Sequence, residues 1–221
     1  MMLTSVFAGL TILMIGDSHL TTPNYLIESL HMDLERAGAQ VHTLGVCGTN
    51  ADDWLKTVPG TCGAAERLGD EKVKLLGRTA PTTPIVELLA KDKPDLLLIV
   101  MGDAMAGYDK DVFPKAWVWQ QVTALTKAIG TTQTACAWVG PAWGTEGGKY
   151  KKTYARVKQV SAFLKNNVAP CEYIDSLTLS KPGEWATTDG QHFTASGYQT
   201  WGDEIAKTLA TMPVVQGLKK K

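Results

Sequence analysis

Short, continuously apolar runs alternate along this chain with longer segments of helical periodicity, and this alternation restricts the fold more than any other feature. Segment 95–102, "DLLLIVMG", is apolar over the length of one strand, which is typical of a strand buried on both faces. Segment 24–39 carries Leu26, Leu30 and Leu34 at helical spacing. The same two patterns predict strands over 10–16, 40–46, 95–102, 134–143 and 171–176, and helices over 24–39, 81–94, 116–130, 150–168 and 194–212. Strand–helix alternation of this kind predicts an α/β fold, a parallel sheet with helices on both faces.

Length and charge restrict the domain count and the partners. The chain has 221 residues, 44% of them hydrophobic, with no internal repeat or low-complexity linker, which predicts a single domain over 1–221. Its 22 basic and 22 acidic residues give a formal net charge of zero. No long-range field therefore attracts nucleic acid or an anionic membrane, so we expect neutral partners and no nucleic acid.

The first fifteen residues are apolar but contain no Lys or Arg, whereas a signal peptide begins with a charged region. This run is also too short to span a bilayer. We expect either a cytosolic chain or an export signal that lies upstream of this start.

Four cysteines bear on the compartment. Cys47 and Cys62 flank a polar, Gly-rich stretch, while Cys136 and Cys171 lie in apolar, strand-like segments. Of the three possible pairings we favour Cys47–Cys62 with Cys136–Cys171, against the alternative of four free thiols. This pairing favours an oxidising compartment, and no CxxC or His/Cys cluster suggests a zinc site or another metal site.

Polar residues collect where the predicted strands end. In parallel sheets, ligands bind at the carboxyl ends of the strands. In this chain the strand ends and the loop before the last helix carry "GDSH" at 16–19, "GVCGTN" at 45–50, "MGDAM" at 101–105, "GPAWG" at 140–144 and "DGQH" at 189–192.

Ser18 is the candidate nucleophile at the first of these ends. A serine hydroxyl needs a base to take its proton and a third group to orient that base. His192 lies in a turn-rich loop, and Asp189, three residues earlier, could hold one imidazole nitrogen while the other faces Ser18. Taken singly, Ser18 could equally be a helix cap, and His192 an exposed residue after a turn at Asp189-Gly190.

The other three histidines are weaker candidates. His31 falls within a predicted helix and His42 within a predicted strand, so we expect structural or surface roles for both. His19 follows Ser18 directly, and either faces substrate or serves a structural role.

Together, "IGDSH" at 15–19 and "DGQHFTASGY" at 189–198 resemble the SGNH/GDSL hydrolase superfamily, and the resemblance spans essentially the whole chain. It implies a three-layer, flavodoxin-like α/β fold without metal or organic cofactor. It further implies that Ser18 is the nucleophile, His192 the general base and Asp189 the orienting acid. "LGVCG" resembles the second conserved block, in which Gly48 would donate its N–H to the oxyanion beside the Ser18 amide.

The third block departs from the family pattern. The family has Gly-x-Asn-Asp after a buried strand, and this chain has "VMGDAM". The asparagine position is Ala104, or Asp103 if the alignment slips by one, and neither supplies a side-chain amide. An ionised Asp103 would repel the developing charge, and losing one oxyanion donor costs about 10²–10³-fold in turnover. Asn50, just beyond Gly48, is a candidate replacement donor.

The "GDSHL" start, the Cys-bounded insertion and "GPAWG" are similar to SGNH proteins of bacterial exopolysaccharide acetylation systems, including those of cellulose and alginate. This resemblance implies an exported or periplasmic protein that handles acetyl groups on a polysaccharide or another acetylated carbohydrate. It also implies a membrane acyltransferase and a polymer-synthesis complex as partners, with no membrane span in this chain.

Seven tryptophans are many for this length. Trp54, Trp143 and Trp185 fall in or beside loops near the predicted strand ends, where an aromatic face could stack on a sugar ring. Asp17, His19 and Asp103 are further candidate substrate contacts. Core positions are expected for the remaining four, Trp117, Trp119, Trp138 and Trp201.

These observations predict an SGNH-type serine O-acetyltransferase or acetylesterase that acts on a bacterial exopolysaccharide, with cellulose the favoured polymer, through an acetyl-serine intermediate. Hydrolysis and transfer share the covalent step and differ only in the acceptor, so the sequence leaves both open. The alternative is a catalytically weakened SGNH protein that binds polysaccharide or delivers acyl groups to a partner acyltransferase.

Overall fold

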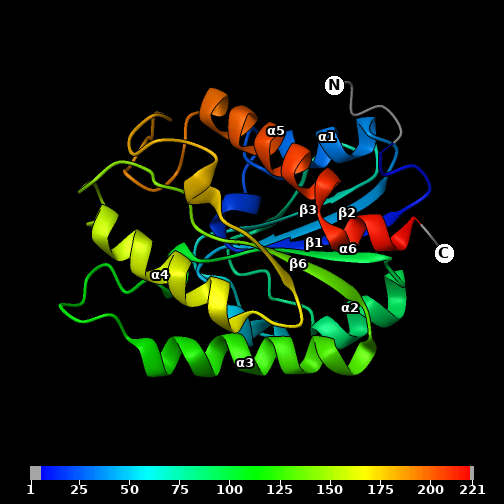
Figure 1. The fold of residues 1–221 in the computed structure, drawn as a ribbon, viewed down its shortest axis with the longest axis horizontal. Coiled ribbons are helices and arrows are strands. Elements are labelled where there is room, and N and C mark those ends of the chain that lie inside the picture. The colour runs from blue at the N-terminus through cyan, green and yellow to red at the C-terminus, as the bar shows by residue number, and fades with distance from the viewer. Residues whose placement is uncertain (1–5, 220–221) are drawn as a thin grey trace.

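One central sheet organises the protein, whose computed structural model describes residues 6–219 (Figure 1). The sheet has seven strands in the order β4-β3-β2-β1-β5-β6-β7. The strands β2, β1, β5, β6 and β7 run parallel, while β3 and β4 extend the β2 edge as an antiparallel hairpin. The bounds are β1 Thr11–Gly16, β2 Gln40–Val46, β3 Ala64–Leu68, β4 Lys74–Gly77, β5 Leu96–Val100, β6 Ala135–Val139 and β7 Glu172–Ile174.

The five predicted strands all occur, and the hairpin β3–β4 is an addition that the sequence analysis did not predict. Both hairpin strands are short, and Leu68 and Leu75 are 43% and 63% exposed. An edge hairpin that is half solvated lacks the continuous apolar run that marks the buried strands. The α/β fold with a largely parallel sheet is confirmed.

Helices cover both faces of this sheet, as predicted. The helices α1, α5 and α6 pack on one face, and α2, α3 and α4 on the other (Figure 1). None of the helices among residues 6–219 is long and apolar enough to cross a lipid bilayer. Their bounds are α1 Ser29–Arg36, α2 Ile85–Asp92, α3 Lys115–Thr132, α4 Tyr154–Asn167, α5 Ala195–Thr211 and α6 Pro213–Leu218.

Several helix boundaries differ from the predictions. The helices α2 and α4 begin at Ile85 and Tyr154, each four residues later than predicted. The first helix begins only at Ser29, because the segment before it forms turns. The last predicted helix ends at Thr211, and α6 then begins with Pro213 at its first position, where the missing N–H of proline costs nothing. Residues 1–5 and 220–221 of the predicted domain lie outside the described residues.

Two disulfides tie loops to the sheet. Cys47, directly after β2, pairs with Cys62, with their Cα atoms 5.3 Å apart. Cys136 in β6 pairs with Cys171, just before β7, at a Cα separation of 4.6 Å. Both separations lie within the usual range for a disulfide.

Two glycines allow the turn after β1 to lie directly on the sheet. Gly16 of β1 pairs with Gly45 of β2. A Cβ on Gly45 would lie 2.3 Å from the carbonyl oxygen of Leu20, and one on Gly16 would lie 2.4 Å from that of Val100. The backbone of the turn that carries Ser18 therefore occupies the space that a side chain at Gly45 would take, while Val100 of β5 and the Leu20 side chain take that at Gly16.

We predict that Gly45→Ala lowers the free energy of unfolding by about 3 kcal/mol, in the upper part of the range for overpacking. The added methyl group meets backbone atoms of Leu20, which cannot move without displacing the Ser18 turn. Urea unfolding followed by circular dichroism measures the effect. Gly217→Ala in α6 is the control, because its Cβ would meet no atom within 4 Å. Equal unfolding midpoints for the two variants would contradict the prediction.

Candidate active site

A chain of side-chain hydrogen bonds joins Ser18, His192 and Asp189 at the carboxyl ends of the parallel strands. Ser18 is the first residue of a short 3-10 helix, η1 (Ser18–Leu20), that follows β1. His192 Nε2 lies 2.7 Å from Ser18 Oγ, and His192 Nδ1 lies 2.7 Å from Asp189 Oδ2. A hydroxyl, an imidazole and a carboxylate in this order are arranged so that the hydroxyl can lose its proton while it attacks an acyl carbon.

The Asp189 carboxylate also holds the backbone of its own loop. Its Oδ1 accepts hydrogen bonds from the backbone N–H groups of Gln191, at 3.0 Å, and His192, at 2.8 Å. Burial by itself would raise the pKa of Asp189, but these N–H donors and the His192 ring outweigh it and hold the pKa below its ordinary value. The carboxylate is therefore ionised and fixed in the orientation that His192 requires.

Aromatic side chains enclose the imidazole of His192. Tyr25 stacks on it with the ring centroids 5.8 Å apart, and Tyr150 meets it edge-on at 5.5 Å. Burial lowers the pKa of His192, the nearby His19 ring adds to this effect, and Asp189 opposes it. The ring is therefore neutral at pH 7 and able to accept a proton.

A cavity of about 520 Å³ opens over Ser18. Gly48 and Asn50, which follow β2, line it together with Ser18, so the structure brings the predicted nucleophile and both predicted oxyanion donors to one space. The aromatic side chains of Trp117 and Tyr150 also line this cavity. Among residues 6–219, no group of three or more His, Cys, Asp or Glu side chains is placed to hold a metal ion.

Local contacts fix the backbone at Gly48. This residue has φ +82°, and a Cβ there would lie 2.0 Å from Thr61 Oγ1. The neighbouring Cys47 is held by its disulfide to Cys62, and the Thr61 N–H donates to the Cys47 carbonyl at 3.0 Å. Only glycine fits this conformation and this space.

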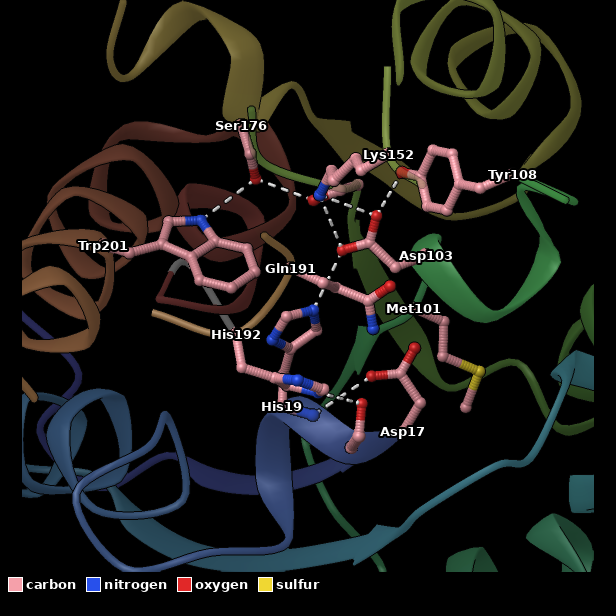
Figure 2. Close-up of polar contacts among 12 residues, drawn as sticks. Asp17, His19, Met101, Asp103, Tyr108, Lys152, Ser176, Gln191, His192 and Trp201 are labelled. Atoms are coloured by element: carbon pink, nitrogen blue, oxygen red, sulfur yellow. Dashed lines mark hydrogen bonds and ion pairs between the residues drawn. The ribbon is translucent and has the colours of Figure 1, made fainter. Parts of the chain in front are cut away.

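The segment that follows β5 is built around a buried ion pair. Asp103, two residues after Met101, lies against Lys152, whose Nζ is 2.8 Å from Asp103 Oδ1 and 3.1 Å from Oδ2. His19 Nε2 lies 3.0 Å from Oδ2, and the Tyr108 hydroxyl donates to Oδ1 (Figure 2). Lys152 is fully buried. Burial alone would raise the pKa of Asp103, but Lys152 and then His19 outweigh it and hold the pKa well below its ordinary range.

This pairing changes the expectation that an ionised Asp103 would repel an oxyanion. Asp103 is ionised, but the Lys152 ammonium offsets its charge at contact distance. Its two oxygens are occupied by three side chains, so it is not free to bind substrate, although it lies at the floor of the cavity. Asp17, the other predicted acidic contact, lies at the same floor and is only 1% exposed.

His19 does not face substrate. It is 2% exposed, and its Nδ1 lies 2.8 Å from the Tyr198 hydroxyl while its Nε2 contacts Asp103. Its backbone N–H donates to Asp17 Oδ1 at 3.2 Å. The prediction of a substrate contact is wrong because both ring nitrogens already have partners beneath the cavity.

The prediction that the three loop tryptophans contact sugar is also wrong. Trp54 is fully buried, and Trp143 and Trp185 are each 8% exposed. The Trp143 indole donates to two backbone carbonyls of the loop that follows β7, and Trp185 packs edge-on against Phe193. Loop position in the sequence does not make a side chain accessible when the loop itself folds onto the core.

Two tryptophans that we expected in the core are exposed instead. Trp117 and Trp119, in the first turns of α3, are 38% and 51% exposed. Trp117 lines the cavity over Ser18. Trp138 and Trp201 are buried, as predicted.

Sequence reasoning missed Lys152, Tyr108 and Gln191. Lys152 lies 49 residues from its partner Asp103, and nothing in the local sequence distinguishes it from the neighbouring lysines. Gln191 had a signal, since it stands between the predicted acid and base in "DGQH". It lines the cavity with Ser18.

We predict that Lys152→Met lowers the free energy of unfolding by about 3–5 kcal/mol, because it leaves the Asp103 charge buried without its cation. The double variant Asp103→Asn/Lys152→Met removes both charges and should recover most of this loss. Urea unfolding measures all three proteins. Lys165→Met, at an exposed position of α4, should leave stability unchanged. A double variant that is less stable than Lys152→Met alone would contradict this account.

A curated relative covers nearly the whole chain. Protein BcsX of Komagataeibacter xylinus is 42% identical over 219 residues, which are 98% of this chain and 82% of BcsX. No model of a known protein family matches the sequence.

Solved structures share the fold. A DUF4886 family protein from Bacteroides uniformis has a TM-score of 0.65 at 15% identity, over 93% of this chain and 84% of its own. A protein of the G-D-S-L family from Desulfitobacterium hafniense has a TM-score of 0.56 at 13% identity, over 90% and 99%. The acetylxylan esterase Axe2 from Geobacillus stearothermophilus, solved as a catalytic mutant, has a TM-score of 0.56 at 12% identity, over 94% and 96%. The chain belongs to the family of protein BcsX, and its fold is that of the SGNH/GDSL hydrolases.

Proposed function

We propose that this protein is a serine esterase or O-acyltransferase that forms an acetyl ester on Ser18 and acts on acetylated carbohydrate. The observation that carries the proposal is the hydrogen-bond series from Asp189 through His192 to Ser18 Oγ, which ends in an open cavity. The similarity of the fold to an acetylxylan esterase supports the acetyl group and the carbohydrate.

The geometry supports a two-step reaction. Ser18 Oγ bonds to the carbonyl carbon while its proton moves to His192 Nε2, and the carbonyl electron pair moves onto oxygen. The backbone N–H groups of Ser18 and Gly48 donate to that oxyanion. The intermediate then collapses, and the departing sugar oxygen takes the proton from His192, which leaves acetyl-Ser18.

The second step decides between hydrolysis and transfer. His192 removes a proton from the acceptor, whose oxygen bonds to the acyl carbon of acetyl-Ser18. The bond between that carbon and Ser18 Oγ then breaks, and His192 returns the proton to Ser18 Oγ. Water gives acetate, and a sugar hydroxyl gives a new acetyl ester. An exopolysaccharide such as cellulose is the acceptor or donor that the sequence resemblance favours, with a membrane acyltransferase and a polymer-synthesis complex as partners.

The compartment is part of the same proposal. Two disulfides join all four cysteines of the chain, and disulfides persist in oxidising compartments. We infer a periplasmic or exported location, where a growing extracellular polysaccharide is accessible.

We predict that Ser18→Ala lowers kcat/KM for an aryl acetate by about 10⁴-fold or more, because the covalent route is lost. A chromogenic aryl acetate assay measures the rate, and intact-mass measurement after rapid quenching should show an added acetyl group on the wild-type protein only. Ser196→Ala, at an exposed serine of α5, is the matched control. Acetylation without turnover would favour an acyl-delivery protein, and equal rates for wild type and Ser18→Ala would exclude the serine mechanism.

We also predict that kcat/KM stays high on the acid side to below pH 6.5. His192 must be neutral to act as the base, and its pKa lies below the ordinary value of 6.5 because the ring is buried. Activity should therefore fall only as the pH drops through this lowered pKa. A pH–rate profile of the wild-type protein tests this. A midpoint of the acid limb above pH 6.5 would contradict the lowered pKa.

A further inference from the structure

The oxyanion site of this protein lacks the side-chain amide that its fold family takes from the third strand end. Ala104 has no polar side chain, and the Asp103 carboxylate at the cavity floor cannot donate a hydrogen bond and is held by Lys152, His19 and Tyr108. The backbone N–H groups of Ser18 and Gly48 are the two donors that remain. A third donor must therefore come from another element if the site is to have three.

Gln191 is a largely buried residue whose side-chain amide has no hydrogen-bond partner in the described part of the protein. Gln191 is 6% exposed, and its backbone N–H donates to Asp189 Oδ1. Its side-chain amide makes no hydrogen bond to any of residues 6–219, yet it lines the cavity that contains Ser18. Figure 2 shows the side chain extending toward the carboxyl groups of Asp17 and Asp103. The amide of a largely buried residue normally has hydrogen-bond partners, so this unpartnered amide beside the cavity is available to a ligand.

The backbone around Gln191 is held rigidly. The Thr145 N–H donates to the Gly190 carbonyl at 2.9 Å, and the Lys149 N–H donates to the Asp189 carbonyl at 2.9 Å. Gly190 has φ +95°, and a Cβ on Gly148 would lie 2.3 Å from the Asp189 carbonyl oxygen. These contacts fix the loop against segment 145–149, so the backbone from which the amide extends is already in place before substrate arrives, as preorganised donors require.

The charges at the cavity floor suit a neutral donor. Burial raises the pKa of Asp17, which favours its uncharged form, and Lys152 offsets the charge of Asp103. A carboxylate at position 191 would add an uncompensated negative charge beside the developing oxyanion. An amide adds a donor and no charge.

We propose that the side-chain amide of Gln191 is the third oxyanion donor, in place of the asparagine that the third strand end lacks. This inference rests on the proposed function. As Ser18 Oγ bonds to the acyl carbon and its proton moves to His192, the carbonyl π electron pair becomes a lone pair on oxygen. A Gln191 Nε2–H then donates to that oxygen, and no covalent bond to Gln191 forms or breaks. This makes Gln191 a catalytic residue and leaves Asn50 as the competing candidate, because Asn50 lines the same cavity.

The test compares Gln191→Met and Gln191→Glu, which keep the length of the side chain, with Asn50→Ala and Ser18→Ala. Gln120→Ala, at an exposed position of α3, is the matched control. Each variant is assayed for kcat and KM on an aryl acetate, and for the rate of covalent labelling by a 4-nitrophenyl alkylphosphonate, whose phosphoryl oxygen mimics the oxyanion. Thermal unfolding verifies that each variant folds.

We expect both Gln191 variants to lose about 10²–10³-fold in kcat, with KM changed by less than about threefold and with slower phosphonate labelling in proportion. A purely structural role would instead lower the unfolding temperature without this split between kcat and KM. Two folded Gln191 variants with wild-type kcat, beside an inactive Ser18→Ala, overturn this inference and leave the proposed function intact. The same holds if Asn50→Ala alone shows the loss. Absence of any Ser18-dependent turnover or labelling in the wild type overturns the proposed function, and this inference with it.

Discussion

The buried ion pair between Asp103 and Lys152 is the interaction on which the arrangement of the site depends. Through Asp103 it joins the end of β5 to the loop before α4, and through His19 it joins both to the turn that carries Ser18. A buried ion pair adds little net stability, but loss of one partner is costly because a charge is left unpaired. The pair therefore holds three chain segments in one relative position more than it strengthens the fold.

The two carboxylates near Ser18 have different roles. Asp189 lies at the rim, accepts hydrogen bonds from its own loop and orients the His192 ring. Asp103 lies beneath the site, where Lys152, His19 and Tyr108 satisfy its oxygens. The first acts on the base directly, and the second keeps the nucleophile turn in place from the floor of the cavity.

The backbone that carries the proposed oxyanion donors is also held in place by local contacts. The Cys47–Cys62 disulfide and the Thr61 contacts hold Gly48 on one side, and the loop around Gly190 is pinned to segment 145–149 on the other. Donors held in this way do not have to reorganise as charge develops on the acyl oxygen. The departure at Ala104 thus leaves a gap in an otherwise rigid site, and the amide of Gln191 faces the same cavity.

The sequence by itself determined the elements whose cause is local. Five strands follow from runs such as 95–102, because a strand buried on both faces must be apolar throughout. The candidate roles of Ser18, Asp189 and His192 were predicted from short motifs at the end of a strand and in the loop before a helix. The tertiary structure alone decided what depends on partners far along the chain. The edge hairpin over Ala64–Gly77, the exposure of Trp117 and the burial of Trp54 were not predicted, because accessibility depends on which faces meet in space. Lys152 and the open amide of Gln191 belong to this second group, since a charge is compensated, or a donor left free, only by what the folded chain places beside it.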